Sequence, residues 1–143
     1  MANLIYSILP VPRRAIVFVH PDVSLAQCVT MMVQDNIGAL VVSDDVTILG
    51  ILSERDIVRA MTKKDFSRRE MKAADILSGK ATVLKSSDTV EMAMEAITKT
   101  RHRHILVSEE GEIIALLSIG DLVFHLLKDQ SLTIEHLQHY IQT

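Results

Sequence analysis

Cysteine and long apolar runs are both scarce in this chain of 143 residues. Cys28 is the only cysteine, which excludes an intrachain disulfide and predicts a cytoplasmic protein from a reducing compartment. The N-terminus lacks the basic start and the cleavage site of a signal peptide, so export is not expected. Apolar runs such as 48–52 and 113–117 have the length of strands and are too short to span a membrane. We therefore expect no membrane partner.

Aromatic residues and positive charge are also in short supply. Tryptophan is absent, aromatic residues make up 3% of the chain, and the formal net charge is −3. The chain thus has neither stacking platforms nor a basic field for nucleic acid, and we expect no such partner. It also has no P-loop, nucleophile-elbow or His-Glu-x-x-His motif. These absences predict a protein that is not an enzyme.

What the chain does contain is an internal repeat. Two stretches return in the same order: Gly-Ala-Leu-Val-Val-Ser (38–43) and Gly-Ile-Leu-Ser-Glu-Arg-Asp (50–56) return as Arg-His-Ile-Leu-Val-Ser (103–108) and Ala-Leu-Leu-Ser-Ile-Gly-Asp (115–121). Ser118 follows Ser53, and Asp121 follows Asp56, by 65 positions. Because polar residues keep the same register as apolar ones, shared hydrophobic periodicity is a poor explanation. The repeat predicts one unit used twice, with two equivalent clefts or a pseudo-twofold axis.

Each repeat predicts the order strand, helix, strand, strand, helix, which is an α/β fold. The middle strands, at 39–42 and 48–52 and again at 105–107 and 113–117, are joined by turns at Asp44-Asp45 and Glu109-Glu110-Gly111. The helices are expected to bury apolar stripes. These stripes are Leu25, Cys28, Val29, Met32 and Val33, then Ile57, Val58 and Met61, then Val90, Ala93, Met94, Ile97 and Thr98, and finally Leu122, Val123, Leu126 and Leu127.

The expected domains are a first unit with its lead-in at 1–62, a charged linker at 63–72, a second unit at 73–128 and a C-terminal helix at 129–143. The last helix has an apolar stripe without a counterpart in the first repeat: Ile134, Leu137, Tyr140 and Ile141. Such a stripe packs on its own body or on a partner subunit. We expect the second arrangement, a homodimer.

The sharpest motif is Ser-x-x-Asp, which occurs twice where a strand runs into a helix. One interpretation is a helix N-cap, because Ser with an acid three residues later has capping-box spacing. The other is a ligand site. A helix N-terminus presents free N–H groups that suit phosphate, and a carboxylate one turn later can accept two hydrogen bonds from a ribose diol. Both interpretations stay open at this point.

The tandem strand-helix-strand-strand-helix unit, ending in Gly-Ile-Leu-Ser-Glu-Arg-Asp and Ala-Leu-Leu-Ser-Ile-Gly-Asp, resembles a pair of CBS domains, named for cystathionine β-synthase. The resemblance covers about 17–127, and Ala73–Leu77 resembles the lead-in of a second CBS unit. It implies two β-α-β-β-α units packed sheet to sheet about a pseudo-twofold axis. It also implies a small stand-alone bacterial sensor that needs no cofactor and binds an adenosine ligand in clefts between the units. That ligand would be AMP, ADP, ATP, NAD(H) or S-adenosylmethionine.

The resemblance also assigns roles to residues. Asp56 and Asp121 would hold ribose hydroxyls, and Ser53 and Ser118 would reach hydroxyl or phosphate oxygens. The remaining candidates are cationic groups and backbone that borders adenine: Arg55, Arg103, His104, Ile16, Val17, Ala81 and Thr82. Arg55 corresponds to Gly120, and Arg103-His104 to Gly38-Ala39, so we expect two unequal clefts. Ala115 stands where the family usually has glycine, and this is expected to tighten the approach of the backbone to a ligand in the second cleft. Leu106 stands where the family often has proline.

Competing interpretations are weaker. His102 and His104, two apart on an expected strand, would share one face and suggest zinc or copper, but no further ligands complete a set, and no metal is expected. Cys28 lies on an apolar stripe, which favours a buried, inert thiol. The rival function is a structural or interaction module with vestigial clefts, recognised by an unknown regulated protein. An enzyme that turns over a bound nucleotide comes third.

Overall fold

The chain forms two compact units in a computed structural model that describes residues 3–63, 66, 70–77 and 79–142. The N-unit is Ala15–Ala81, and the C-unit combines Met1–Arg14 with Thr82–Thr143. The N-terminal segment joins the second repeat because Ile5 is fully buried in the core of the C-unit and its N–H donates to the Asp88 carbonyl over 2.9 Å. Half of the expected linker, at 64–65 and 67–69, lies outside the described residues.

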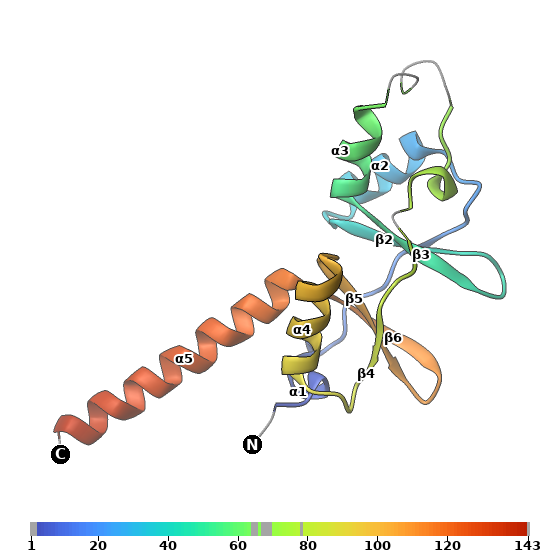
Figure 1. Ribbon diagram of the computed structural model, residues 1–143. Coiled ribbons are helices and arrows are strands. Elements are labelled where there is room, and N and C mark those ends of the chain that lie inside the picture. The colour runs from blue at the N-terminus through green and yellow to red at the C-terminus, as the bar shows by residue number, and fades with distance from the viewer. Residues whose placement is uncertain (1–2, 64–65, 67–69, 78, 143) are drawn as a thin grey trace. The chain divides into compact units, whose positions relative to one another are not determined.

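Both units have the predicted order of elements, and the α/β fold class is confirmed (Figure 1). The N-unit contains β1 (Phe18–Val19), α2 (Leu25–Gln34), β2 (Ala39–Ser43), β3 (Ile48–Ser53), α3 (Glu54–Met61) and the 3-10 helix η1 (Ala73–Ile76). The C-unit contains α1 (Ile5–Ile8), β4 (Val83–Lys85), α4 (Val90–Thr100), β5 (His104–Glu109), β6 (Glu112–Ser118) and α5 (Ile119–Gln142).

Each unit is built on a three-stranded sheet, in the order β1-β2-β3 or β4-β5-β6. The first two strands are parallel and the last two antiparallel. The 65-residue register of the sequence holds in the pairing, since Phe18 lies opposite Val41 and Val83 lies opposite Leu106. The strands of the two units therefore pair in equivalent registers.

The hairpin turns lie where the sequence predicts them. Asp44 accepts hydrogen bonds from the Thr47 and Val46 backbone N–H groups over 2.6 and 2.8 Å, and these bonds lower the pKa of its carboxyl group below the ordinary value. In the second hairpin Glu110 and Gly111 have φ angles of 51° and 81°. Two successive positive φ values are typical of tight hairpin turns, in which glycine is the favoured residue.

The predicted apolar stripes are only partly buried. Each helix buries a narrow row, for example Leu25, Cys28 and Met32 in α2. The neighbouring row is exposed, and the prediction is wrong for these residues: Val29, Val33, Val58, Met61, Thr98, Val123 and Leu127. The physical reason is that a small three-stranded sheet covers about one residue per turn of the helix packed on it. Burial of a wider apolar stripe would require a further layer of protein on the outer side of the helix.

The C-terminal helix is not separate from the second repeat. α5 runs without a break from Ile119 to Gln142, through the expected boundary at 128–129, and it contacts α4 and β6, with α4 beside its beginning (Figure 1). The rest extends clear of the C-unit sheet (Figure 1). The side chains of Ile134, Leu137 and Ile141 are exposed. The side chain of Tyr140 is not among those that the structure describes. Within the described residues, no helix is long and apolar enough to cross a membrane.

The repeat supplies a matched test of packing at one strand position. A Cβ on Gly50 would lie 2.9 Å from the Gly79 carbonyl oxygen, whereas its counterpart Ala115 already carries one. We expect Gly50→Ala to lower the free energy of unfolding by roughly 1–3 kcal/mol through overpacking. Ala115→Gly should cost roughly 0.5–1 kcal/mol through backbone entropy. Urea unfolding measures both, and a smaller loss for Gly50→Ala would show that the Gly79 carbonyl does not constrain this strand.

Candidate functional site

The first Ser-x-x-Asp motif forms a complete capping box at the start of α3. Asp56 Oδ2 accepts hydrogen bonds from Ser53 N over 2.8 Å and from Ser53 Oγ over 2.9 Å. In return, Asp56 N donates to Ser53 Oγ over 3.4 Å. Asp56 is 5% exposed, so these bonds compensate the carboxylate for its burial. The N-cap interpretation is confirmed for this motif.

The second motif repeats this arrangement at the start of α5. Asp121 Oδ2 accepts from Ser118 N over 2.8 Å and from Ser118 Oγ over 3.0 Å, while Asp121 N donates to Ser118 Oγ over 3.2 Å. The Asp121 side chain is 25% exposed. The two caps have the same bonds, but the second carboxylate is more accessible.

Capping engages one carboxylate oxygen in each motif. Every hydrogen bond that the two carboxylates accept ends on Oδ2, and within the described part of the chain no hydrogen bond or ion pair ends on Oδ1 of Asp56 or Asp121. An ionised carboxylate oxygen accepts up to two hydrogen bonds. Each cap can therefore hold its helix and still accept hydroxyl groups through Oδ1.

Cationic candidates adjoin the second motif. The Arg103 carbonyl accepts a hydrogen bond from Ile119 N over 2.8 Å, which fixes the Arg103 backbone beside the helix start. His104 lies directly opposite Ser118 in the β5–β6 hairpin. Residues opposite each other in an antiparallel pair share one face of the sheet. The structure thus brings Arg103, His104, Ser118 and Asp121 together at one edge of the C-unit.

The same positions in the N-unit carry different groups. The Gly38 carbonyl accepts from Glu54 N over 3.0 Å, and Ala39 lies opposite Ser53. A Cβ on Gly38 would lie 3.2 Å from Glu54 Oε1, so a carboxylate covers the place where the C-unit has Arg103. Arg55 is exposed on the first turn of α3. Where the C-unit carries the Arg103 guanidinium, equivalent backbone in the N-unit therefore lies beside the Glu54 carboxylate, and the N-unit has its own arginine one residue later, at Arg55.

The residues expected to border adenine lie just before the first strand of each repeat. Ile16, Val17, Ala81 and Thr82 are all partly exposed. The Val17 carbonyl accepts from Val41 N over 3.0 Å, and the Thr82 carbonyl accepts from Leu106 N over 2.9 Å. These bonds hold the two lead-in segments against their sheets in equivalent positions.

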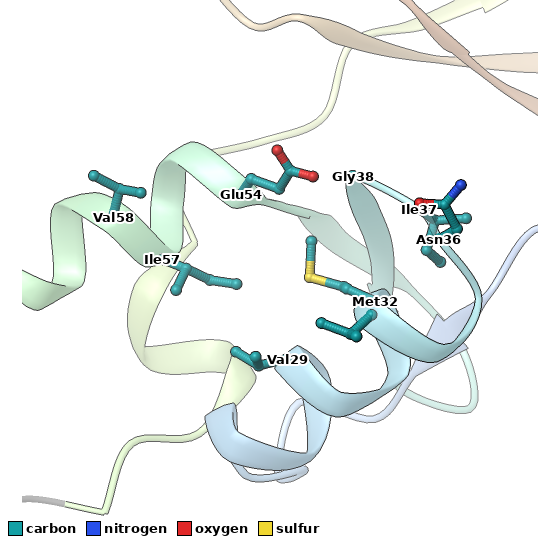
Figure 2. A pocket seen from close by; sticks show the side chains of 9 residues that line it. Val29, Met32, Asn36, Ile37, Gly38, Glu54, Ile57 and Val58 are labelled. Carbon is teal, nitrogen blue, oxygen red and sulfur yellow. The ribbon is translucent and has the colours of Figure 1, made fainter.

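A separate hollow of about 470 Å³ lies between α2 and α3 of the N-unit. Val29, Met32 and Ile57 point into it, and the Glu54 carboxylate lies at its rim beside Gly38 (Figure 2). Ser53 and Asp56 do not line it. The hollow is an apolar surface on the helices, and it differs in chemistry from the polar motif.

The cysteine and the histidines that the sequence offered as candidates do not form a reactive or metal-binding site in the described residues. Cys28 is fully buried, as predicted, and burial raises the pKa of its thiol. His102 and His104 were expected to lie on one strand face, but β5 begins only at His104, so this expectation is wrong. His102 instead follows Arg101, the residue with φ of 60° that caps the end of α4. The described residues contain no cluster of three or more His, Cys, Asp or Glu side chains suited to a metal ion.

Two groups near the motifs were missed by the sequence interpretation. Arg14 Nη2 lies 2.9 Å from Asp121 Oδ2, and Glu54 lies over Gly38. The adjacent basic pair Arg13-Arg14, just before the first repeat, was a usable sign of a phosphate contact. Its position beside the second motif was not, because it depends on the N-terminal segment packing on the C-unit.

Comparison with known proteins identifies the repeat. The sequence profile described as "CBS domain" matches residues 7–63 and 73–128. The CBS domain-containing protein CBSX3, mitochondrial, of Arabidopsis thaliana is 32% identical over 126 residues, which cover 85% of this chain and 61% of CBSX3. The Arabidopsis protein CBSCBSPB5 is 29% identical over 118 residues, and the chain spans 21% of its length.

Solved structures agree with the sequence comparison. A CBS-domain protein from Agrobacterium tumefaciens is 31% identical and has a TM-score of 0.77, with 86% of this chain and 92% of that chain covered. The structure of CBSX2 in complex with AMP is 22% identical and has a TM-score of 0.69, with 90% and 98% covered. At that identity the second likeness shows the shared fold alone.

Proposed function

This chain belongs to the CBS-domain family, and from that membership we propose that it is a sensor that binds AMP, ADP, ATP or NAD(H). A tandem pair of CBS domains is a known regulatory module. The observation that carries the proposal is the pair of capping carboxylates whose Oδ1 oxygens remain available for a ribose diol. The complex of CBSX2 with AMP supports the ligand class by analogy of fold.

The C-unit motif is the better nucleotide site of the two. Asp121 would accept ribose hydroxyls, while Arg103, His104 and the N-terminus of α5 would face phosphate. In the N-unit the Glu54 carboxylate beside Gly38 opposes a phosphate group at the matching position. The negative charge of a phosphate group therefore favours nucleotide binding at the C-unit motif over binding at the N-unit motif.

The proposed role is regulation without catalysis. A nucleotide that binds one arrangement of the protein more tightly shifts the population toward it, and an unknown regulated protein would read the change. The lone, buried Cys28 is compatible with a reducing cytoplasm. A nucleotide recovered unchanged after incubation would support this role, and its turnover would favour the enzyme interpretation.

A thermal-shift screen separates the sensor from a structural module with vestigial clefts. A ligand at about one hundred times its dissociation constant adds about 2.7 kcal/mol of stability. AMP, ATP, NADH and S-adenosylmethionine form a suitable panel, and no shift with any of them would favour the structural module. Mass spectrometry of the denatured protein would identify a nucleotide that co-purifies.

Removing each carboxylate in turn tests the ribose contact. Asp121→Ala should weaken AMP binding by about 1.5–3 kcal/mol for each lost charge-assisted hydrogen bond. Its loss as a helix cap should cost only about 1 kcal/mol of folding stability. Calorimetry and urea unfolding measure the two effects, with Asp56→Ala as the matched control in the N-unit. Unchanged binding in both variants would reduce the motifs to helix caps.

Arg103 tests the phosphate contact separately. Arg103→Ala should weaken AMP binding by about 1.5–3 kcal/mol, since one charge-assisted bond to phosphate is lost. Adenosine has no phosphate, so its affinity should stay nearly the same. Calorimetry with both ligands decides the matter. An equal loss for adenosine would place Arg103 away from the phosphate.

We further propose that the chain is a homodimer that uses the exposed stripe of α5. Leu127, Ile134 and Ile141 recur every seven residues, with Val123 and Leu137 on the adjoining row. These spacings follow the a and d positions of a two-helix seam. Because a helix that extends from its body is marginal in water without packing, a second copy of α5 is the fitting occupant.

Shortening α5 tests this assembly. A chain that ends at Lys128 should lose the dimer, while the part of α5 that contacts α4 and β6 stays in place. The full-length variant Ile134→Ser/Leu137→Ser should weaken the dimer in the same direction, because it removes apolar area from the seam. Sedimentation measures both. An intact chain that is monomeric at about tens of micromolar would contradict the proposal.

A further inference from the structure

Arg14 places a positively charged group beside the second motif. The other repeat has no arginine at the equivalent position. Arg14 Nη2 donates to Asp121 Oδ2 over 2.9 Å, and the Arg14 side chain is 61% exposed. Exposed ion pairs contribute little to folding stability, because solvent screens them and side-chain entropy opposes them. The consequence of this pair lies instead in where it holds the guanidinium group.

The segment that carries Arg14 is fixed by other contacts. Ile5 is fully buried in the C-unit core, and the Leu4–Thr89 bridge ties the same segment to the start of α4. The neighbouring Arg13 lies 3.7 Å from Glu109 Oε2. These contacts hold the N-terminal segment on the C-unit upstream of Arg14, and the exposed Arg14 side chain then reaches Asp121.

The guanidinium group has donors to spare. Arginine carries five N–H donors in a planar fork, and Arg14 makes no other hydrogen bond or ion pair with the residues that the structure describes. This fork is well matched to phosphate oxygens. Asp121 therefore orients Arg14 while the remaining donors stay available to an anion.

The position relative to ribose makes that anion a 5′-phosphate. In the proposed function Asp121 accepts ribose hydroxyls through Oδ1, and a 5′-phosphate is joined to the same sugar ring through C5′ and one ester oxygen. With the ribose held at Oδ1, the Arg14 guanidinium at Asp121 Oδ2 would be the donor group from the N-terminal segment that can turn toward that phosphate. Arg103, fixed beside the start of α5, would approach it from the sheet edge.

The other repeat provides an internal comparison. The residue 65 positions after Arg14 is Gly79, as Gly38 is the counterpart of Arg103. The N-unit motif thus has neither arginine at these positions, and the Glu54 carboxylate lies beside Gly38. The two arginines without a counterpart in the N-unit, Arg14 and Arg103, therefore both lie at the C-unit motif.

We propose that Arg14 is a phosphate-binding residue of the C-unit site and makes that site selective for nucleotides over nucleosides. The inference rests on the proposed binding of adenosine nucleotides at Asp121. Arg14 and Arg103 then grip the phosphate from two separate segments, and Asp121 both holds the ribose and orients Arg14. A phosphate-free nucleoside gains nothing from either arginine.

Calorimetry with AMP and adenosine tests the proposal on the full chain. Arg14→Gln should raise the dissociation constant for AMP about tenfold or more, as expected for a lost charge-assisted bond, and change that for adenosine by less than about twofold. Arg14→Lys should recover part of the AMP affinity. Arg13→Gln is the matched control, because Arg13 pairs with Glu109, and it should leave both ligands unchanged.

The outcomes separate this inference from the function on which it rests. A wild-type chain that binds neither ligand overturns both. A wild-type chain that binds AMP, with an unchanged AMP-to-adenosine ratio in Arg14→Gln, overturns the role of Arg14 alone. Equal weakening of both ligands would show that Arg14 only positions Asp121, and this also contradicts a phosphate contact. Circular dichroism of each variant confirms that the fold is intact.

Discussion

The capping carboxylate at the junction of strand and helix is the interaction on which both units depend. Asp56 and Asp121 each accept from the backbone and hydroxyl of the serine three residues earlier, which fixes the angle between strand and helix. These bonds satisfy N–H groups that a helix start otherwise leaves unpaired. Because they end on one oxygen, structure and ligand binding need not compete for the same carboxylate atom.

The two repeats share a backbone and differ in charge. The bonds from Glu54 N to the Gly38 carbonyl and from Ile119 N to the Arg103 carbonyl are equivalent, yet they place a carboxylate at one motif and a guanidinium at the other. Duplication thus preserved the hydrogen-bond frame while side chains on that frame diverged. A frame held by backbone bonds tolerates such change, since the exposed side chains contribute little to its stability.

Small sheets explain the apolar surface that remains. Each helix buries a single row against three strands, and a second apolar row stays outside, as for Val29 and Val33 in α2. In α5 this second row continues beyond the sheet of the C-unit, with Ile134, Leu137 and Ile141 exposed. Exposed apolar rows of this extent are typical of surfaces that meet another protein surface.

Periodicity and register in the sequence were sufficient for the order of elements, the hairpin turns and the capping motifs. These features depend on contacts between residues close in the chain, such as Ser118 with Asp121, and the 65-residue repeat doubled each observation. Which apolar row is buried was decided only by the tertiary structure, because it depends on how much area a sheet offers a helix. The same holds for Arg14: its contact with Asp121 joins residues more than one hundred positions apart and exists because Ile5 is buried in the core of the second repeat. Hydrogen bonds between residues close in the chain can be inferred from their spacing in the sequence. Contacts between distant segments depend on how those segments pack, and the spacing of residues does not reveal this.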